Sequence, residues 1–209
     1  MDKPTLAERR AALLHAGALV SRSITSILDP DFLLHRTVDI ICIAFGFYYA
    51  GVFLIDETGE WAVLRAGRGE AGATMVAEGH KLRVGGQSMI GAATGRNKAV
   101  IALDVGEEPV HFKNQYLPLT RSEMALPLSV GDKVIGALTV QSVEEAAFTE
   151  DDITVLQGMA DQLAVAIQNA RLYSENERLL AQATRRARLL MAAADVGKGV
   201  TSILDLDEL

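Results

Sequence analysis

Residues 121–142 read R-S-E-M-A-L-P-L-S-V-G-D-K-V-I-G-A-L-T-V-Q-S and give the strongest indication of the fold class. On both sides of Gly131-Asp132, apolar side chains recur at every second position, which places them on one face of a β-strand. Gly and Asp at the centre are typical of a tight hairpin turn. The alternate positions include Ala125, Ile135 and Ala137, which are also small or apolar. We therefore predict a β-hairpin that is covered on both faces and lies at the centre of a sheet.

The composition limits the classes of protein to which the chain can belong. Its net charge is −7 and its Lys and Arg residues are scattered, which argues against nucleic-acid binding, because that needs a basic patch. One cysteine allows neither an intramolecular disulfide nor a cysteine-rich zinc site. With no signal-peptide pattern, this predicts a cytoplasmic protein. The uncharged residues 40–55 are fewer than the roughly 20 of a membrane-spanning helix, so we expect no membrane contact.

Helical patterns dominate the N-terminal part of the chain. Apolar residues recur in steps of three and four over residues 6–28, which predicts one helix. Asp29 and Pro30 end it and begin another, because Asp is a good N-cap and Pro is favoured at the first helical position. The second helix should run to about residue 45 and bury a side made of Phe32, Leu33, Val38, Ile41 and Phe45.

Short strands and loops are expected between this helix and the hairpin. The predicted strands cover residues 48–56, 61–66, 81–84 and 99–102. Residues 67–79 are rich in Gly and Ala, and we expect a mobile loop there. A small helix should run from Ser88 to Thr94 and end at Gly95. Residues 104–119 are expected to form a variable loop.

A long helix should follow Thr149, which can cap it, with Asp152 at the third helical position. No helix breaker comes before Gly197, so the helix should have about 45 residues and a length of about 70 Å. Its apolar stripe changes phase after Ala170, and Asn176 lies on the seam of the second stripe, where a polar residue can fix register. The spacing of this second stripe is that of a coiled coil, and its members are Leu180, Ala183, Ala187, Leu190 and Ala194. We expect this part to pair with a copy of itself, and a solvated helix end is the open alternative.

The end of the chain repeats its beginning. Residues 9–33 and 185–209 are identical at fifteen of twenty-five positions, at an offset of 176 residues, and both contain T-S-I-L-D-x-D-x-L. Repetition at a fixed offset is typical of an array of similar units, so a second domain of the same kind should begin at the C-terminus. The expected organisation is a linker helix at 1–18, a domain at 19–170, a signalling linker helix at 171–194, and the start of the second domain at 195–209.

The hairpin and the helix after it resemble a known family. The motifs S-E-M-A-L-P-L-x-V-G-D-K-V-I-G-A-L-T-V-Q-S and F-T-E-D-D-I-x-x-L-x-x-M-A-D-Q-L-A-V-A-I-x-N-A-R-L-Y are similar to the C-terminal half of a bacterial GAF domain, a small sensory module of signalling proteins. The resemblance covers residues 19–173. It implies an α+β fold with a central five- or six-stranded antiparallel sheet. The N- and C-terminal helices would lie on one face, with short helices and loops over a pocket on the other.

The sequence shows no catalytic constellation, so we expect a non-catalytic domain. Cys42 lies in the apolar run I-I-C-I-A-F, which is typical of a core residue. The GAF-like methionine sulfoxide reductases use several cysteines, which this chain lacks. His80 and His111 fall where GAF domains have their pocket. Neither has a second His or a Cys at metal-ligand spacing, which argues against a metal or haem site.

The resemblance also bears on two other ligands of GAF domains. Domains that bind cyclic nucleotides carry Asn-Lys, then Phe, and three residues later Asp-Glu. Here Asn97-Lys98 and Phe112 are present, but Tyr116-Leu117 stands where the acidic pair is expected. Bilin-binding domains attach the pigment through a cysteine, and residues 52–209 contain none. Both departures argue against these ligands, so the cofactor, if there is one, is unknown.

What remains is a pocket whose ligand the sequence does not name. Its candidate lining residues, each of which is alternatively an ordinary core residue, are Phe53, Met75, Met89, His111, Phe112, Tyr116 and Met124. The resemblance implies a sensory domain of a signalling protein, with a tandem-GAF sensor histidine kinase of a two-component system as the expected parent. We expect a homodimer through the N- and C-terminal helices, followed in the same chain by a GAF domain and an effector domain, and an unidentified small molecule as ligand. The alternative is a structural dimerisation module without a ligand.

Overall fold

The computed structural model describes residues 29–104 and 114–204, with the backbone alone for residues 192–204. The chain divides into two compact units, Met1–Ala170 and Arg171–Leu209, and each is described by itself. The helix predicted at residues 6–28 lies outside the described residues.

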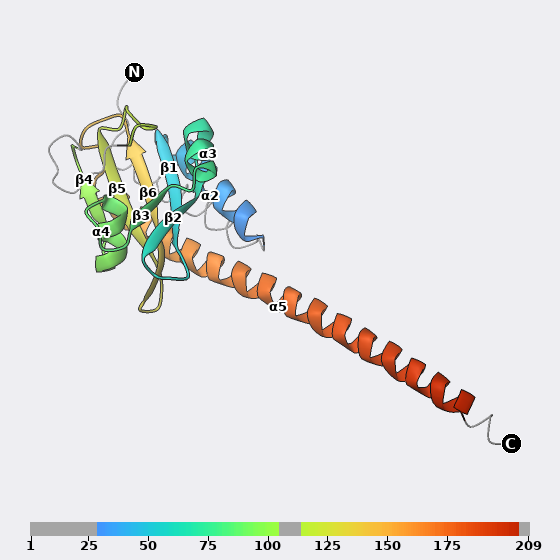
Figure 1. The fold of residues 1–209 in the computed structure, drawn as a ribbon. Coiled ribbons are helices and arrows are strands. Elements are labelled where there is room, and N and C mark those ends of the chain that lie inside the picture. Colours follow the sequence, from blue (N-terminus) through green and yellow to red (C-terminus); the bar gives the residue numbers. More distant parts are fainter. Residues whose placement is uncertain (1–28, 105–113, 205–209) are drawn as a thin grey trace. The chain divides into compact units, whose positions relative to one another are not determined.

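Six strands form one antiparallel sheet in the first unit (Figure 1). They are β1 (Tyr49–Ile55), β2 (Trp61–Gly67), β3 (Lys81–Arg83), β4 (Val100–Ala102), β5 (Ser122–Val130) and β6 (Lys133–Ser142). Their order is β3-β2-β1-β6-β5-β4, so β1 and β6 are the central pair. The predicted sheet is confirmed, and the four short strands begin and end within one residue of the predicted bounds.

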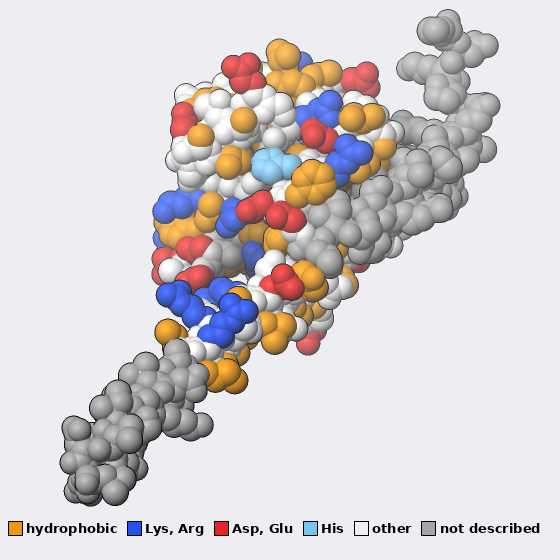
Figure 2. Space-filling view, turned by 90° about the vertical axis from the view of Figure 1, so that its right-hand side faces the viewer, with side chains coloured by type: hydrophobic (Ala, Val, Ile, Leu, Met, Phe, Trp, Pro, Cys, Tyr) orange, Lys and Arg blue, Asp and Glu red, His pale blue; other side chains and the backbone are white. Residues whose placement is uncertain are grey.

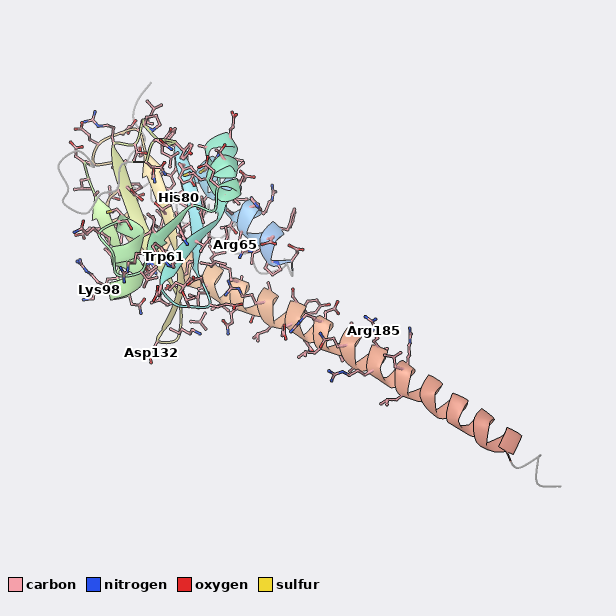
Figure 3. The ribbon with its side chains drawn as sticks, viewed as in Figure 1. Trp61, Arg65, His80, Lys98, Asp132 and Arg185 are labelled. Carbon is pink, nitrogen blue, oxygen red and sulfur yellow. The ribbon has the colours of Figure 1, made fainter. Side chains whose placement is uncertain are left out.

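The β5–β6 hairpin matches its prediction. Leu126 lies opposite Leu138 in the register, and Gly131 makes the turn with a φ of +58°. Asp132 lies at the tip of the hairpin (Figure 3). On its other side β6 pairs with β1, where Tyr49 lies opposite Gln141. The hairpin is therefore in the interior of the sheet, as its two apolar faces indicated.

The helix α2 (Pro30–Phe45) begins where the sequence predicted. The Asp29 carboxylate accepts a hydrogen bond from the Phe32 backbone N–H at 2.8 Å, and this satisfies a donor that the helix leaves free. One prediction about its packing is wrong, because the Phe32 side chain is 60% exposed. The buried face instead consists of two neighbouring rows of residues, each with a spacing of four along the helix. Its residues are Leu33, Leu34, Thr37, Val38, Ile41 and Cys42.

The segment predicted as a mobile loop is the helix α3 (Gly69–Ala77). Its small residues allow the helix to approach β2 closely. A Cβ atom at Gly72 would lie 2.1 Å from the carbonyl carbon of Gly67, and Met75 is fully buried beneath the helix. Gly72 therefore serves close packing, and the expectation of a loop is wrong.

The small helix α4 (Met89–Arg96) begins as predicted but ends later. The Ser88 hydroxyl accepts a hydrogen bond from the Gly91 N–H at 2.9 Å and caps the helix. Gly95 does not end it. A Cβ atom there would lie 2.5 Å from the Cα atom of Gly85, so this glycine serves close packing. Asn97 ends the helix with a φ of +50°, and its side-chain oxygen accepts a hydrogen bond from Ser129.

The two faces of the sheet carry separate cores. The helix α2 and the first part of α5 (Glu150–Leu204) lie on one face (Figure 1). They pack there against alternate residues of the central strands, such as Val52, Met124 and Leu138. On the other face α3, α4 and residues 114–120 cover the intervening positions, such as Phe53 and Ala137. This is the expected arrangement of helices, and it confirms the predicted α+β class.

The helix α5 begins as predicted and extends further than predicted. Thr149 and Asp152 cap it reciprocally, with the Thr149 N–H donating to the Asp152 carboxylate at 2.8 Å and the Asp152 N–H to the Thr149 hydroxyl at 3.3 Å. The helix has 55 residues and passes through Gly197 to Leu204. Glycine lowers helix propensity by about 1 kcal/mol without forbidding the conformation, so the expected end at Gly197 is wrong.

The burial of α5 changes at one position. Buried residues recur along the helix as far as Ala170, whereas every side chain from Arg171 to Met191 is exposed.

In the part of the chain that the structure describes, no helix is long and apolar enough to cross a membrane.

Charged side chains of both signs lie next to one another on the surface shown in Figure 2, with hydrophobic side chains scattered between them. Arg65 on β2 and Asp31 on α2 form one such pair, with their side-chain atoms 3.3 Å apart. Both side chains are largely exposed, and exposed pairs of this kind contribute about 0–1 kcal/mol. The pair therefore adds little to the packing of α2 on the sheet.

Candidate functional site

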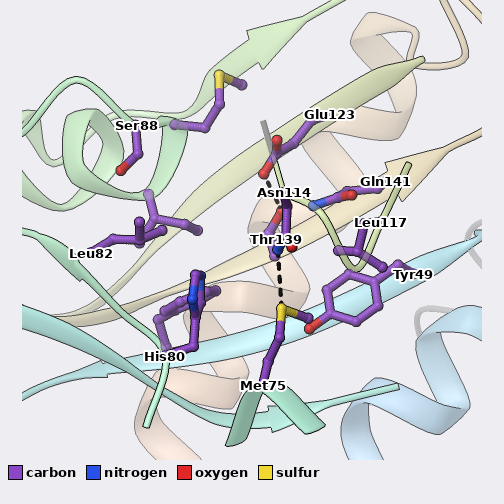
Figure 4. A pocket seen from close by; sticks show the side chains of 13 residues that line it. Tyr49, Met75, His80, Leu82, Ser88, Asn114, Leu117, Glu123, Thr139 and Gln141 are labelled. Atoms are coloured by element: carbon purple, nitrogen blue, oxygen red, sulfur yellow. Dashed lines mark hydrogen bonds between the residues drawn. The ribbon is translucent and has the colours of Figure 1, made fainter. Parts of the chain in front are cut away.

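A cavity of about 30 Å³ lies on the face of the sheet that α3 and α4 cover (Figure 4). It has enough space for one or two water-sized groups. Its apolar lining consists of Phe53, Met75, Leu82, Met89, Ile90 and Leu117. Its polar lining consists of Tyr49, His80, Ser88, Asn114, Glu123, Thr139 and Gln141.

A buried carboxylic acid lies among the strands that form the floor of this cavity. Glu123 on β5 is 7% exposed and lies opposite Gln141 of β6. The Thr139 hydroxyl donates a hydrogen bond to Glu123 Oε1 at 2.8 Å. Burial raises the pKa of Glu123 to about 7, although hydrogen bonds with Thr139 and Gln141 act in the opposite direction. The acid therefore changes its charge near neutral pH.

A second polar group of the cavity is the hydroxyl of Tyr49, at the start of β1. The side chain is 3% exposed, and the hydroxyl has no hydrogen-bond partner among the described residues. It lies against glycine backbone, because a Cβ atom at Gly67 would be 2.4 Å from it. Burial raises the pKa of Tyr49, and the negative charge of Glu123 adds to this. The hydroxyl is therefore neutral and keeps its proton available for donation.

Residues 114–120, which we call the strap, connect α3 to the sheet beside the cavity. The Asn114 amide donates to the Met75 sulfur at 3.0 Å (Figure 4). The Tyr116 hydroxyl donates to a Glu78 carboxylate oxygen at 2.5 Å. At the other end the Thr120 hydroxyl donates to Gln141 Oε1 at 2.6 Å. The strap is thus tied to α3 at Met75, to the C-cap residue of α3 at Glu78, and to β6 at Gln141.

His80 is the remaining titratable residue of the described lining. It lies between α3 and β3 (Figure 3), and its ring meets the edge of Phe53 with the centroids 6.0 Å apart. Burial lowers the pKa of His80, against the opposing charge of Glu78, so the imidazole is neutral at pH 7. Among the described residues, no three His, Cys, Asp or Glu side chains are grouped so as to hold a metal ion.

The structure brings together some of the residues that the sequence singled out. Phe53, Met75 and Met89 line the cavity. Tyr116 is half-buried and reaches Glu78 instead of the lining. His111 and Phe112 lie outside the described residues.

Met124 is on the other side of the sheet from the cavity. It is fully buried in the core beneath α2 and α5. Successive side chains of a strand point to opposite faces, so its neighbour Glu123 faces the cavity instead. The expectation missed Glu123, although a single acid in the apolar strand S-E-M-A-L-P was a usable signal. Tyr49, Thr139 and Gln141 carried no such signal.

The order and direction of the strands and the helices on both faces can be compared with known proteins. The family model described as GAF domain matches residues 28–168. The chain belongs to the GAF domain family. GAF domains are regulatory and sensory modules, and the cavity of this GAF domain is formed by the strand faces and short helices described above.

Solved structures share the fold of this GAF domain. One is the free methionine-R-sulfoxide reductase of Neisseria meningitidis in complex with its substrate, with a TM-score of 0.65, 24% identity, and coverage of 83% of this chain and 96% of that one. Another is the GAF domain of a phosphoenolpyruvate-protein phosphotransferase from Coxiella burnetii, with a TM-score of 0.72, 20% identity, and coverage of 79% and 98%. At these identities the likeness shows the fold alone.

A curated relative matches a shorter stretch. The formate hydrogenlyase transcriptional activator FhlA of Escherichia coli (strain K12) is 39% identical over 54 residues, which are 26% of this chain and 8% of FhlA. The match therefore spans less than a tenth of that protein's length.

The single cysteine of the GAF domain lies away from the cavity. Cys42 is 4% exposed and packs in the core beneath α2 and α5. Burial raises the pKa of its thiol to about 11, against the opposing influence of Arg68. We expect it to react with a chromogenic disulfide reagent only after denaturation, because the thiolate is the reactive form. Rapid labelling of the native protein, timed by absorbance, would contradict this burial.

Proposed function

We propose that this GAF domain is a non-catalytic sensory input module of a cytoplasmic bacterial signalling protein, with a sensor histidine kinase as the favoured parent. A small molecule or a partner contact at the cavity side would alter the packing of β5 and β6. That change would reach α5, which would carry it to the next module of a homodimer. The observation that carries the proposal is the continuity of α5 beyond the last residue that the domain buries.

The strands β5 and β6 supply a direct connection between the cavity and α5. Their residues Glu123, Thr139 and Gln141 face the cavity. Their alternate residues, such as Met124 and Val140, share a core with the first part of α5. Because protein interiors are densely packed, a side-chain displacement on one face of a strand is felt on the other. Two packings of this core would give the helix two positions.

The second part of α5 has the features of a helix that needs a partner. From Arg171 to Met191 every side chain is exposed, including large apolar ones such as Leu180 and Leu190. Most helical stability in proteins comes from packing of an amphipathic face, and the three-four spacing of the apolar residues is that of a coiled coil. These features support pairing with a second copy of the chain.

Replacing Leu180 by Asp tests this pairing. We expect the homodimer dissociation constant to rise about 100-fold or more, because each copy loses about 1.5–3 kcal/mol of apolar burial. The measurement is sedimentation equilibrium. The matched control is Leu179→Asp, which changes an equally large and similarly exposed neighbour, 51% against 60%, that is off the predicted seam. Equal effects of both changes, or a monomeric unaltered chain, would overturn the pairing.

The internal repeat supports a tandem arrangement. At the offset of 176 residues, Leu204 corresponds to Leu28 and Asp205 to Asp29. Asp29 is the N-cap of α2, and α5 is helical as far as Leu204, the last residue that the structure describes. By the repeat, Leu204 corresponds to the residue just before the N-cap of α2. We propose that α5 leads out of one domain and into the next, with an effector domain further along the chain.

A second candidate function is a dimerisation module that binds no ligand. The small cavity favours it, because sites for small molecules usually have about 300–1,000 Å³, and Met75, Met89 and Phe53 occupy much of the space between helices and sheet. Native mass spectrometry of the purified chain separates the two candidates. A discrete additional mass that is lost on denaturation supports the sensor, whereas a bare dimer supports the module.

A further inference from the structure

We propose that the second part of α5 pairs with a second copy of the chain in an antiparallel orientation, about an axis between Ala181 and Gln182. This rests on the pairing proposed above and adds the direction and the register of the two helices. The surface concerned is the seam of the coiled coil. Its described residues, at alternating steps of three and four, are Tyr173, Asn176, Leu180, Ala183, Ala187 and Leu190.

Four charged side chains flank the seam, with one acid and one base on each side. Glu175 and Arg186 are eleven residues apart, which is about three turns of an α-helix, so they lie on the same side of it. Glu177 and Arg188 have the same spacing and lie on the other side. Each side is about 90–110° from the middle of the seam. All four side chains are exposed, so they are within reach of a helix that packs on the seam.

A parallel pair would bring like charges together. In that orientation each residue is level with its own counterpart, and one side of the first helix faces the other side of the second. Glu175 would then lie beside Glu177 of the second copy, and Arg186 would lie beside Arg188. Because the pair has twofold symmetry, each of these repulsive contacts occurs twice. Like charges on helices cost about as much as opposite charges gain.

An antiparallel pair would bring opposite charges together. The same side of both helices then faces inward, and the direction of the second helix is reversed. With the proposed axis, Glu175 lies within two residues, or about 3 Å, of the level of Arg186 of the second copy. Glu177 is equally close to the level of Arg188. Four attractive contacts replace four repulsive ones, and charges beside the seam set the orientation of a coiled coil.

The apolar residues of the seam fit the same axis. Leu180 is level with Ala183 of the second copy, so a large side chain meets a small one. Leu190 is level with Tyr173, and these side chains are 71% and 47% exposed in the single chain. A parallel pair would set Leu180 against Leu180 and Ala183 against Ala183, which gives uneven layers where close packing is required. Its polar gain would be Asn176 against Asn176, at the cost of the like-charge contacts.

The charged residues are available for these contacts. Glu177, Arg186 and Arg188 form no ion pair with another residue that the structure describes. Glu175 accepts from Arg178, three residues later, at 2.8 Å. Both side chains are exposed, and a carboxylate can accept a second donor, so this ion pair leaves room for an arginine of the second copy.

The antiparallel orientation has a consequence for signalling. The N-terminal ends of the two paired segments, each of which follows a GAF domain, lie at opposite ends of the pair. A displacement that enters α5 from one domain would therefore travel toward the end at which the second copy's α5 leaves its own domain. The signal would couple the two copies instead of running along both in the same direction.

Disulfide trapping tests the orientation. Leu190→Cys and Tyr173→Cys would be oxidised in a glutathione buffer, each alone and as an equimolar mixture. We expect a disulfide-linked dimer from the mixture alone, because in the antiparallel pair position 190 is 17 residues, or about 25 Å, from its own counterpart. A disulfide needs Cα atoms within about 7 Å. Mass spectrometry identifies the linked chains, and the unaltered chain, whose Cys42 is buried, is the control.

The sign of a charge reversal gives a second test, which needs no added cysteine. Arg186→Glu would face Glu175 in the antiparallel pair and should raise the homodimer dissociation constant about tenfold at low salt. In a parallel pair it would face Arg188 and lower that constant. The matched control is Arg185→Glu (Figure 3), which changes the net charge equally at an exposed neighbour on the far side of the helix from the seam. Glu175→Arg combined with Arg186→Glu should restore the affinity of the unaltered chain in sedimentation equilibrium.

Each outcome decides the proposal. A disulfide-linked dimer from Leu190→Cys alone, or tighter association of Arg186→Glu, would show a parallel pair and overturn the orientation while the pairing stands. Equal effects of Arg186→Glu and Arg185→Glu, or a dimer that forms no disulfide even in the mixture, would place the contact elsewhere on the chain. A monomeric unaltered chain would overturn the pairing itself, and the orientation with it.

Discussion

Gly72→Ala is expected to destabilise the GAF domain by about 3 kcal/mol, at the upper end of the cost of overpacking a core. The added Cβ atom would lie 2.1 Å from the carbonyl carbon and 2.2 Å from the oxygen of Gly67. Both are backbone atoms of β2 and cannot rotate away. The helix α3 would have to lift from the sheet, and Met75 would lose part of its burial. Urea denaturation followed by circular dichroism measures the change.

Gly158→Ala is the matched control for this prediction. Gly158 lies in α5, and a Cβ atom there would meet no atom within 4 Å. Alanine should therefore stabilise the domain by about 1 kcal/mol through helix propensity alone. Propensity favours alanine at both positions, so opposite signs isolate the contact with Gly67. Stabilisation by both changes would show that α3 does not lie against β2 as described.

The second large effect concerns the pH dependence of stability. The folded-state pKa of Glu123 is about 7, above the ordinary value of 4.5. The folded state then holds the proton more tightly than the unfolded state. This contribution is fully present below pH 4.5 and is lost as the pH rises through 7. At about 1.4 kcal/mol per pKa unit, the free energy of unfolding should fall by about 3 kcal/mol over this range.

Glu123→Gln should remove this decline. The amide has the shape of the acid and carries no charge to bury, so the variant should be more stable than the unaltered chain near pH 8, by up to about 3 kcal/mol, and equal to it near pH 5. Urea denaturation at several pH values gives both curves. Glu60→Gln is the control and should keep the slope of the unaltered chain. A parallel slope for Glu123→Gln would mean that another group titrates.

Local signals account for the elements that the sequence predicted well. The alternation around Gly131-Asp132, the Asp29-Pro30 pair and the Thr149–Asp152 box each act within a few residues. The helix α3 was missed for the opposite reason. Its Gly72 is required by a strand that approaches it in three dimensions, and in a sequence such a glycine looks the same as one in a loop.

The candidate site was predicted less well than the fold. Phe53, Met75 and Met89 were identified because large apolar residues around a pocket are common. On β5 we expected Met124 to line the cavity, but its neighbour Glu123 does so. The difference is one residue, and a shift of one residue moves a side chain to the other face of a sheet. The pairing of Tyr49 with Gln141 depends on the register between β1 and β6, which no local pattern in either strand contains.

The pleat of β5 has a consequence for how such a domain diversifies. Glu123 and Ala125 belong to the cavity side, whereas Met124 and Leu126 belong to the side that packs with α5. Substitutions at every second position would alter what is recognised and leave the contact with the output helix intact. Related domains could therefore evolve to recognise different ligands while the contact between β5 and α5 stays unchanged.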